Sequence, residues 1–433
     1  MRRVLPWVCA LAALLLSFQG LTLGFGESDQ GWSGAFYGQA VRALSWQDWG
    51  AMRPEGELYL DHPPGLVWLA WLPAQLLGHG PLAMRLIPWL FGGLAAAGVA
   101  RLVQTQFLET DQVGPWPALA ALAAIAHPAF ATYASLPDPQ GSLVWAGVLW
   151  ACVAARLERP GWAVAAIAWT AWMDWPGLLL GACLALWAVL NKQNRNAGVY
   201  AGSTVLFGGG ILAWIATLGG WPALWEAFLH RTGATGFLSE ASTPMGLLPA
   251  LQAIGEHHLW GATWPLTLLG VPALFWALRQ RSILAIPACV GLAHVGIFLQ
   301  GAAIHPYWQL YAVSGLSLLS IAFIPQIPAR FATLAGSKPL RIGLPLLLLI
   351  LLSLAGARSA ARAKVIWMKE APSRAMLRIT GQTLAQETEH GERVHSPESR
   401  VPALAWHANR VIVWESTQAR QVWRDGDQWK VAR

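Results

Sequence analysis

The residues of this chain that could do chemistry are a few acids and histidines set among apolar runs. The stretch YLDHPPG places Asp61 and His62 directly before two prolines and an apolar run that ends near Leu77. The prolines hold His62 extended and open a short helix, too short to span and therefore interfacial or re-entrant. A carboxylate can act as a general base, and a histidine can bind an anion or a metal ion. This pattern predicts a polar site at the edge of a bilayer.

Other acids and aromatic residues stand where apolar runs begin or end. Asp29 precedes a stretch with apolar residues at helical spacing, GWSGAFYGQAVRALSW, which predicts a helix lying in the membrane interface. Asp138 lies between prolines in SLPDPQG, and Asp174 lies in MDWPG. The stretch HPYWQLY holds His305 and Tyr307. Ionisable residues at membrane depth are costly, so each of these is a candidate site residue.

Each candidate also has a purely structural interpretation. Asp29 and Asp138 precede predicted helices, where an aspartate often accepts a backbone N–H as an N-cap. Capping would account for Asp61 but not for the histidine beside it. His305 could be one hydrogen-bonded residue of an interfacial aromatic belt.

The sequence GEHH, which ends in His257 and His258, has residue types that bind zinc or similar ions. Its spacing to other ligands is not diagnostic, so the alternative is a pair of ordinary surface histidines.

The composition indicates an integral membrane protein. Charged residues make up 12% of the 433 residues and hydrophobic residues 55%, whereas soluble chains carry about a quarter charged residues. The 27 tryptophans fit membrane interfaces. The formal charge of +7 comes from basic residues scattered between apolar runs, which favours loop charges over nucleic-acid binding. The four cysteines stand in apolar segments without paired spacing, so we interpret them as packing residues: Cys9, Cys152, Cys183 and Cys289.

The apolar runs predict an all-α polytopic membrane protein with about 11 transmembrane helices. A run of about 20 residues is needed to cross the roughly 30 Å of hydrocarbon. The first run continues to about Phe25, so we interpret it as a retained helix, not a cleaved signal peptide. The predicted spans are 5–25, 82–102, 116–134, 141–157, 161–173, 177–190, 198–219, 260–278, 283–300, 307–325 and 341–357.

Basic residues predict which side of the membrane each loop faces. If the spans alternate, most lysines and arginines between them fall on one side, which the positive-inside rule makes cytoplasmic. The opposite side receives a first outer loop (residues 26–81), a second outer loop (220–259) and a tail (358–433). The candidate acids and histidines fall on that same side, which indicates one polar cavity there. Alternating apolar residues in RVIVWES and QVWRDGDQW predict strands in the tail.

Together these motifs resemble the GT-C type membrane glycosyltransferases of family 39, which use polyprenyl-phosphate donors and include protein O-mannosyltransferases and aminoarabinose transferases. YLDHPP is similar to the family's Y-[FL]-[DE]-[KH]-P-P, and AMRLIPWLFGGL to its R-L-P segment. SLPDP, MDWPG and HPYWQLY look like further motifs, and LRITGQTLAQETEHGERV is similar to the family's small outer domain. The resemblance implies a transmembrane GT-C domain over residues 1–357 and a small α/β domain over 358–433.

The resemblance also implies roles for single residues. Asp29 matches the catalytic acid that deprotonates the acceptor hydroxyl. Asp61 matches an acid that, with a later histidine, here His257 or His258, holds a divalent metal ion in some members. His62 stands where the aminoarabinose branch has a lysine that faces the lipid phosphate.

Two departures from the family pattern affect these roles. Gln30 follows the first acid where many members have a second acid. Because His62 is not permanently charged, donor-phosphate binding is expected to involve Arg85 or Arg53 as well. The remaining candidates, which we expect to line the site, are Asp138, Asp174, His305 and Tyr307.

The function implied is transfer of a sugar from a polyprenyl monophosphate to a hydroxyl of a glycan, lipid or protein, with inversion, at the non-cytoplasmic face of a bacterial inner or plasma membrane. A transporter is the main alternative, but its ionisable residues would lie near the midplane, and the sequence shows no convincing internal repeat. A lipid-binding membrane protein without catalysis is a further alternative. Neither the sugar nor the acceptor follows from the sequence.

Overall fold

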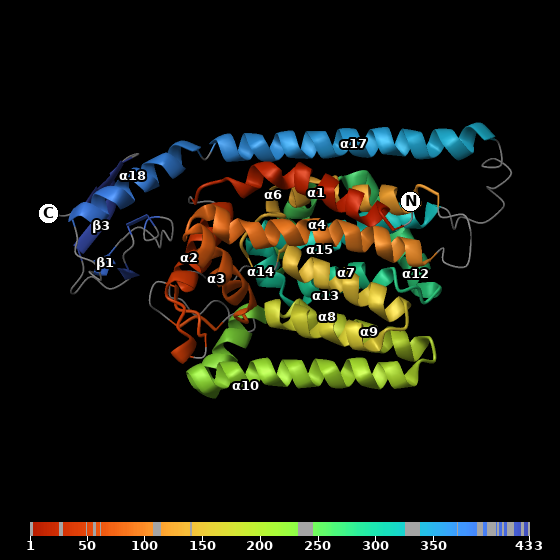
Figure 1. Cartoon of the computed structure of the whole chain (residues 1–433), viewed down its shortest axis with the longest axis horizontal. Helices are drawn as coiled ribbons and strands as arrows, with labels where there is room; N and C mark the ends of the chain where they lie inside the picture. Colours follow the sequence, from red (N-terminus) through yellow and green to blue (C-terminus); the bar gives the residue numbers. More distant parts are fainter. Residues whose placement is uncertain are drawn as a thin grey trace.

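The helices of the chain lie roughly side by side along the long axis of the molecule, with α17 along one edge of the bundle and α10 along the other (Figure 1). The computed structural model describes residues 3–25, 29–48, 50–54, 58–60, 62–106, 114–138, 141–232, 246–324, 338–369, 371–387, 393–395, 404, 407–408, 411–413, 420–425 and 428–431. The helices are α1 (Leu5–Leu21), α2 (Asp29–Arg42), η1 (Trp46–Asp48), α3 (Gly65–Leu77), α4 (Pro81–Thr105), α5 (Trp116–Ile125), α6 (Pro128–Tyr133), α7 (Ser142–Arg156), α8 (Pro160–Met173), α9 (Pro176–Leu190), α10 (Asn194–Thr232), α11 (Leu247–Gly261), α12 (Trp264–Arg279), α13 (Ala285–Ile297), α14 (Leu299–Ile304), η3 (Pro306–Gln309), α15 (Leu310–Ala322), α17 (Lys338–Lys369) and α18 (Ala371–Glu387).

Prolines decide where many of these helices begin. A proline stands at the first or second position of α1, α4, α5, α6, α8, α9 and α12. Proline suits that position because its missing N–H would have no helical partner there. Pro128 also divides the predicted span 116–134 into α5 and α6, and the His127 side chain between them accepts a hydrogen bond from the Phe130 N–H at 3.1 Å. That span is therefore a broken helix.

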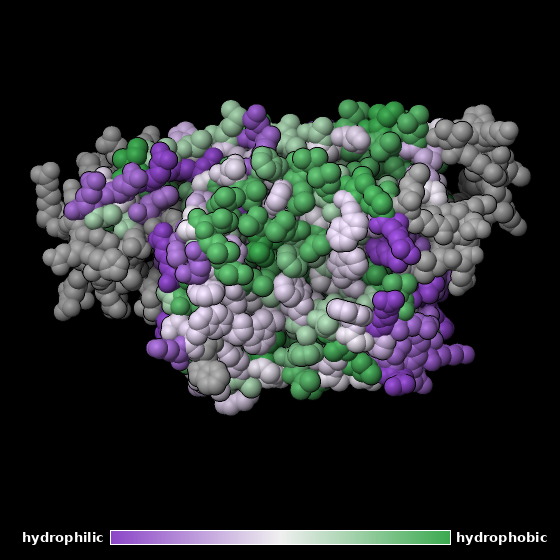
Figure 2. Space-filling view, viewed as in Figure 1, coloured by the Kyte–Doolittle hydropathy of each residue, from purple (hydrophilic) through white to green (hydrophobic). Residues whose placement is uncertain are grey.

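Several helices have the length and composition of membrane spans. Three described helices qualify alone: Pro81–Thr105, Asn194–Pro222 and Gly343–Lys369. A fourth qualifies if α11 and α12, which meet at a bend of 113°, count as one broken span. Six other apolar helices have only 10–17 residues. The surface over the middle of the bundle is hydrophobic and its ends are hydrophilic (Figure 2). The chain is thus an integral membrane protein, whereas the count of eleven spans stays a prediction.

Three other predicted boundaries differ from the structure. The helix expected over 198–219 is part of α10, which continues to Thr232 across a non-helical Gly220. The span 283–300 is divided, because α13 ends at Ile297 and α14 begins at Leu299. The last span, 341–357, is the middle of the 32-residue α17.

The helix α4 lies at the centre of the bundle, where it packs against α1, α5 and α7. Its buried face is made mainly of alanine and glycine, for example over residues 95–98. Small residues allow helix backbones to approach closely in a bilayer, where no hydrophobic effect drives helices together. The centre of α4 therefore fixes the positions of the helices that carry the candidate site.

The first outer loop contains the two helices that the sequence predicts. α2 covers the stretch after the first acid, and α3 begins at Gly65, with Pro64 as its N-cap. α3 packs against α2, α4 and α8. The loop is thus joined to the bundle at the end where α8 meets α9.

The C-terminal segment combines helices and a small sheet. α17 continues without a break past residue 357, so the predicted boundary between the two domains falls inside a helix. The division of the chain into these two domains stays a prediction. After α18 come β1 (Arg393–His395), β2 (Val411–Val413), β3 (Arg420–Asp425) and β4 (Gln428–Val431). The strand order is β2-β1-β3-β4, with β1 parallel to both neighbours and β3 antiparallel to β4. These elements lie at the end of the bundle that carries α2 and α3 (Figure 1).

Candidate functional site

The centre of the candidate site is a buried pair formed by His62 and Asp174. The Nδ1 atom of His62 lies 2.7 Å from Oδ1 of Asp174, and the two residues are 4% and 0% exposed. His62 stands just before α3, and Asp174 is the extended residue that ends α8. A buried carboxylate at hydrogen-bond distance fixes the orientation and the tautomer of an imidazole. The pair therefore holds the His62 ring in a fixed position, from which it can contact an anion.

Two glycines allow the backbones around this pair to approach closely. A Cβ atom on Gly65 would lie 2.4 Å from the carbonyl oxygen of Trp172, and one on Gly177 would lie 2.1 Å from the backbone nitrogen of Ala171. Side chains larger than hydrogen do not fit at such distances. Gly65 brings the start of α3, and Gly177 the start of α9, against the last turn of α8. Both glycines thus hold the segments that carry His62 and Asp174.

A second acid and a tyrosine lie close to the pair. Asp138 is 2% exposed and Tyr311 is fully buried. Tyr311 is near enough to Asp174 and Asp138 for both carboxylates to act on its hydroxyl electrostatically. The N-cap of α7 is Gly141, so the interpretation of Asp138 as the cap of that helix is wrong. Sequence reasoning did not single out Tyr311, although it is the last residue of HPYWQLY.

Aromatic rings surround His62 on the side of the first outer loop. The ring centroid of His62 lies 6.4 Å from that of Tyr37 on α2 and 5.9 Å from that of Tyr59. Phe36 contacts both tyrosines, with centroids 5.4 and 5.0 Å away. A charge set among such rings is screened less than one in water, so its interaction with an anion is strengthened.

The predicted phosphate-binding arginines differ in their surroundings. Arg85 is completely buried, donates from Nε to the carbonyl oxygen of Leu23 at 3.0 Å and from Nη1 to that of Ser135 at 3.4 Å, and lies 5.9 Å from the Phe25 ring centroid. It joins α4 to the end of α1 and to the segment that leads to Asp138. Arg53 is half-buried beside the backbone hydrogen bond from Tyr59 to Met52. Phosphate binding by either residue stays a prediction.

His305 and Tyr307 belong to an aromatic cluster. Their ring centroids are 5.2 Å apart, and the Tyr307 ring lies 5.8 Å from that of Tyr133 on α6. Tyr133 in turn lies 5.8 Å from Trp260 on α11. This cluster connects the second outer loop to the segment that leads into Tyr311.

The two histidines of α11 have partners of their own. His257 Nε2 donates to the carbonyl oxygen of Ala303 at 2.8 Å, and His258 is hydrogen-bonded to Gln309. Within the part of the chain that the structure describes, no three His, Cys, Asp or Glu side chains come together as a metal site would need. Asp61, the third predicted ligand, lies outside the described residues. These histidines do not form a ligand set by themselves, so the metal site stays a prediction.

The predicted catalytic acid lies in the same loop as His62. Asp29 is the first residue of α2, and α2 packs against α3 and α4. Its side chain lies outside what the structure describes. The other end of α2 carries Arg42, whose pKa burial lowers to about 10, so that it remains a cation at neutral pH.

Comparisons with known proteins agree with this architecture. No family model and no curated protein matches the sequence. Among solved structures, ArnT from Cupriavidus metallidurans bound to undecaprenyl phosphate has a TM-score of 0.62 and 15% identity, over 95% of this chain and 85% of that chain. The same protein in the apo state has a TM-score of 0.60 and 14% identity, over 95% and 86%. The oligosaccharyltransferase AglB from Archaeoglobus fulgidus, in complex with an inhibitory peptide and a dolichol-phosphate, has a TM-score of 0.58 and 13% identity, over 97% of this chain and 65% of AglB.

These likenesses concern the fold. The structures extend over almost the whole of this chain, whereas the identities of 13–15% are too low to transfer an activity. The resemblance that the motifs indicated is thereby confirmed at the level of architecture: the chain has the fold of the GT-C type glycosyltransferases.

Proposed function

We propose that this protein is a membrane glycosyltransferase that moves a sugar from a polyprenyl monophosphate to an acceptor hydroxyl. The observation that carries the proposal is the buried His62–Asp174 pair at the start of α3, in a chain with the GT-C fold. One of the solved structures with this fold contains undecaprenyl phosphate and another contains a dolichol-phosphate. A lipid phosphate bound by this chain would need a hydrogen-bond donor at a fixed position, which the oriented imidazole of His62 supplies.

The reaction we propose is a single displacement at the anomeric carbon. The acceptor oxygen forms a bond to that carbon while the bond from the carbon to the phosphate oxygen breaks. Asp29 takes the acceptor's proton as general base, and the bonding electron pair leaves with the polyprenyl phosphate. One displacement inverts the configuration of the sugar. The acceptor is a hydroxyl of a glycan, lipid or protein.

His62 stabilises the leaving group in this scheme. Negative charge grows on the phosphate as the bond breaks, and an ion already positioned beside it needs no reorganisation. Asp174 keeps the ring oriented through the hydrogen bond to Nδ1. Tyr311 and Asp138 are buried nearby, and both Asp174 and Asp138 act electrostatically on the Tyr311 hydroxyl.

The position of the site fits a lipid-linked donor. The lipid stays in the bilayer, so the sugar phosphate can be presented only near the headgroups. We place the reaction at the non-cytoplasmic face of a bacterial inner or plasma membrane, where the positive-inside rule puts the first outer loop. A divalent metal held by Asp61 with His257 or His258 remains part of the proposal, but the chemistry above does not depend on it.

The test uses the purified full chain in lipid with sugar-loaded polyprenyl monophosphates, the corresponding pyrophosphates, nucleotide sugars and a mixture of membrane glycans and lipids as acceptors. Mass spectrometry measures released polyprenyl phosphate and glycosylated acceptor. Release from one monophosphate donor, with equal formation of product, supports the proposal and names the sugar. Turnover of nucleotide sugars alone would contradict it. Uptake of a polar solute into proteoliposomes, without any transfer, would favour a transporter.

A further inference from the structure

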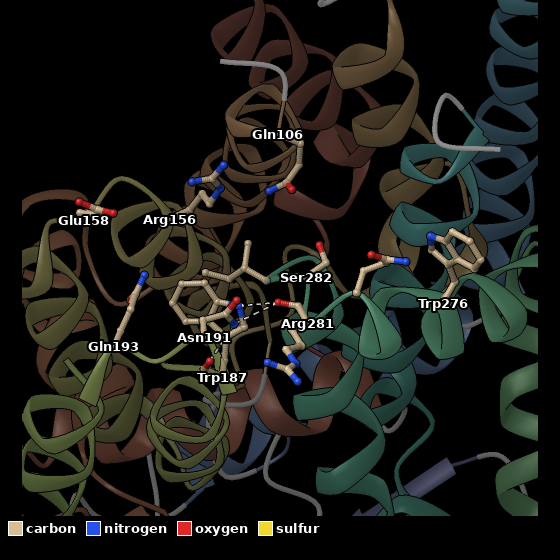
Figure 3. Close-up of a pocket in the computed structure, with 11 residues that line it drawn as sticks. Gln106, Arg156, Glu158, Trp187, Asn191, Gln193, Trp276, Arg281 and Ser282 are labelled. Atoms are coloured by element: carbon tan, nitrogen blue, oxygen red, sulfur yellow. Dashed lines mark hydrogen bonds between the residues drawn. The ribbon is translucent and has the colours of Figure 1, made fainter. Parts of the chain in front are cut away.

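A polar cavity lies at the end of the bundle opposite the candidate site. Its volume is about 550 Å³, and it is lined by residues at the far ends of α4, α7, α9 and α12 (Figure 3). The first residues of α7 and α9 adjoin Asp138 and Asp174, whereas the cavity is formed at their last residues. The cavity is therefore separated from the candidate site by the length of these helices.

Three helices end at this cavity in the same unusual way. After α7, α9 and α12 the backbone turns through a residue with positive φ: Glu158 (55°), Lys192 (61°) and Arg281 (52°). Within the described ranges these are the non-glycine residues with such a conformation. Glycine is the usual residue there, because a side chain costs about 1 kcal/mol or more. All three residues are charged, although glycine would make these turns more stable. We infer that the charges at this end of the bundle have a role other than stability.

These turns also remove backbone acceptors from the cavity. In α7 the N–H groups of Glu158 and Arg159 donate to the carbonyl oxygens of Ala155 and Ala154. The corresponding bonds are made after α9, to Val189 and Ala188, and after α12, to Leu278 and Ala277. Helix C-termini normally present unpaired carbonyl oxygens, which attract cations. Here two carbonyl oxygens at the end of each helix are occupied, which increases the weight of the side chains in determining which ligand the cavity attracts.

The side chains of the cavity are mainly hydrogen-bond donors. The side chain of Arg156 is half-buried and forms no hydrogen bond or ion pair with another described residue. The Nε2 atom of Gln106 is buried and has no hydrogen-bond partner among the described residues. Glu158 is the acid of the lining and is exposed. A half-buried guanidinium and a buried amide without acceptors point to an anionic ligand.

The cavity wall itself is held rigidly. The backbone oxygen of Arg281 accepts hydrogen bonds from Trp187 Nε1 at 2.9 Å and Asn191 Nδ2 at 3.2 Å (Figure 3). The Arg281 side chain returns to the end of α9, where Nη1 donates to the carbonyl oxygen of Leu190 at 2.7 Å. These bonds fix the α12–α13 turn against the end of α9.

The surroundings add positive charge. The lining has two basic residues, Arg156 and Arg281, and one acid, Glu158. Further basic residues are neighbours of the lining in the sequence: Arg159, Lys192 and Arg279. The lining also includes Trp187 and Trp276, residues typical of the headgroup level of a bilayer. Figure 2 shows hydrophilic surface at this end, where α9 meets α10. Basic pockets between membrane helices bind phosphate-bearing lipid headgroups.

We propose that this cavity, with Arg156 and Gln106 as its donors, binds a phosphate group, which a lipid headgroup or free phosphate would supply. The site stands apart from the proposed reaction, so it holds whether or not the chain is a glycosyltransferase. Arg156 would bind the phosphate oxygens through its guanidinium, and Gln106 through its amide. The carboxylate of Glu158 would repel the bound phosphate, which keeps the binding reversible.

The test is native mass spectrometry of the detergent-purified full chain after titration with phosphatidylglycerol, phosphatidylcholine or inorganic phosphate. Arg156→Gln should weaken phosphatidylglycerol binding about tenfold, because a hydrogen-bonded charge is lost. Glu158→Gln should tighten it about threefold, because a repelling charge is removed. A misfolded variant could not bind more tightly, so the second variant guards against loss of structure. Arg159→Gln, the same charge change at an exposed residue outside the lining, is the matched control and should have less than about a twofold effect.

The three ligands distinguish the sources of the phosphate. Binding of phosphatidylglycerol over phosphatidylcholine, with both variant effects, establishes a lipid headgroup site. Arg156-dependent binding of inorganic phosphate alone establishes a free-phosphate site. Equal binding of the two lipids overturns the proposal. The proposal is also overturned if Arg156→Gln and Glu158→Gln bind phosphatidylglycerol with the same affinity as Arg159→Gln.

Discussion

The imidazole of His62 and the carboxylate of Asp174 lie 2.7 Å apart, although 112 residues separate them in the chain. The pair joins the first outer loop to the end of α8 and sits among Tyr37, Tyr59 and the start of α3. Burying an ionisable carboxylate in such a pair costs desolvation energy, so the pair contributes little to stability by itself. We therefore interpret it as a device that holds His62 ready for an anion.

Replacing the carboxylate should leave the fold but disturb the histidine. In Asp174→Asn the side chain keeps its shape but loses the carboxylate that orients the His62 ring. We expect transfer to fall about 100-fold. Steady-state kinetics with the lipid donor measures the effect, and Glu256→Gln, which changes an exposed acid on α11, is the control. An unchanged rate in Asp174→Asn would mean that the pair is only structural.

Two substitutions of His62 should show whether binding of the lipid phosphate needs a positive charge or the imidazole ring itself. His62→Gln removes the imidazole, so binding of undecaprenyl phosphate should weaken about tenfold. His62→Lys supplies a cation and should keep this binding, at about pH 8 as well, where lysine remains charged. Equilibrium binding of the lipid phosphate to the two variants and the original chain gives the comparison. If His62→Gln binds as tightly as the original, phosphate binding belongs to Arg85 or Arg53 instead.

The sequence predicted the individual residues of this site better than the contacts between them. Pro63 and Pro64 located the start of α3, and the polar residues at the ends of apolar runs identified Asp174 and His62. Their pairing could not be predicted, because it depends on how α3 packs against α8. Tyr311 was missed for the same reason: in sequence it is one more aromatic residue of an apolar run, and only packing brings it to the two acids.

Helix lengths were less predictable than helix positions. Hydropathy does not show that His127 and Pro128 break a span, nor that α13 ends before Phe298, because backbone hydrogen bonds can be interrupted wherever neighbouring helices cover them. The role of Arg85 shows a similar limit. A motif indicates that an arginine is present, while its bonds to the backbone carbonyls of Leu23 and Ser135 appear only in the structure.

Gly65 should be needed for both stability and activity. In Gly65→Ala the new Cβ would meet the carbonyl oxygen of Trp172 at 2.4 Å, so α3 must move away from α8. We expect a loss of about 1–3 kcal/mol in stability and a disturbed His62–Asp174 pair. Thermal unfolding in detergent and the transfer assay measure the two effects.

The matched control for this prediction is Gly80→Ala. A Cβ at Gly80, which lies just before α4, has no other atom within 4 Å. Its midpoint of unfolding should equal that of the original chain. Equal midpoints for Gly65→Ala and Gly80→Ala would show that α3 does not depend on the close approach at Gly65.

Contact between the C-terminal segment and Phe25, which follows α1, should weaken in acid. Burial lowers the pKa of His407, and the charges of Arg378 and Arg42 lower it further to a smaller extent. The hydrogen bond from His407 to the backbone of Phe25 raises this pKa, but by less than burial lowers it. The docked ring therefore binds a proton less readily than the undocked ring. The contact is at full strength above about pH 6.5 and weakens as the pH falls below it.

Hydrogen exchange in α18 measures this contact. Exchange, corrected for its intrinsic pH dependence, should be less protected at about pH 5.5 than at about pH 7.5, and His407→Gln should abolish the difference. A pH effect that persists in His407→Gln would assign the dependence to another group.

The most direct test of the proposed reaction is the amount of polyprenyl phosphate released from a lipid-linked sugar by the original chain and by Asp29→Asn, with donor binding measured in both. The account predicts equal donor binding and at least about a 100-fold loss of release in Asp29→Asn, because the acceptor hydroxyl then has no base. Glu256→Gln should match the original chain. Release by Asp29→Asn at the original rate would contradict the account and leave Asp29 as a helix cap.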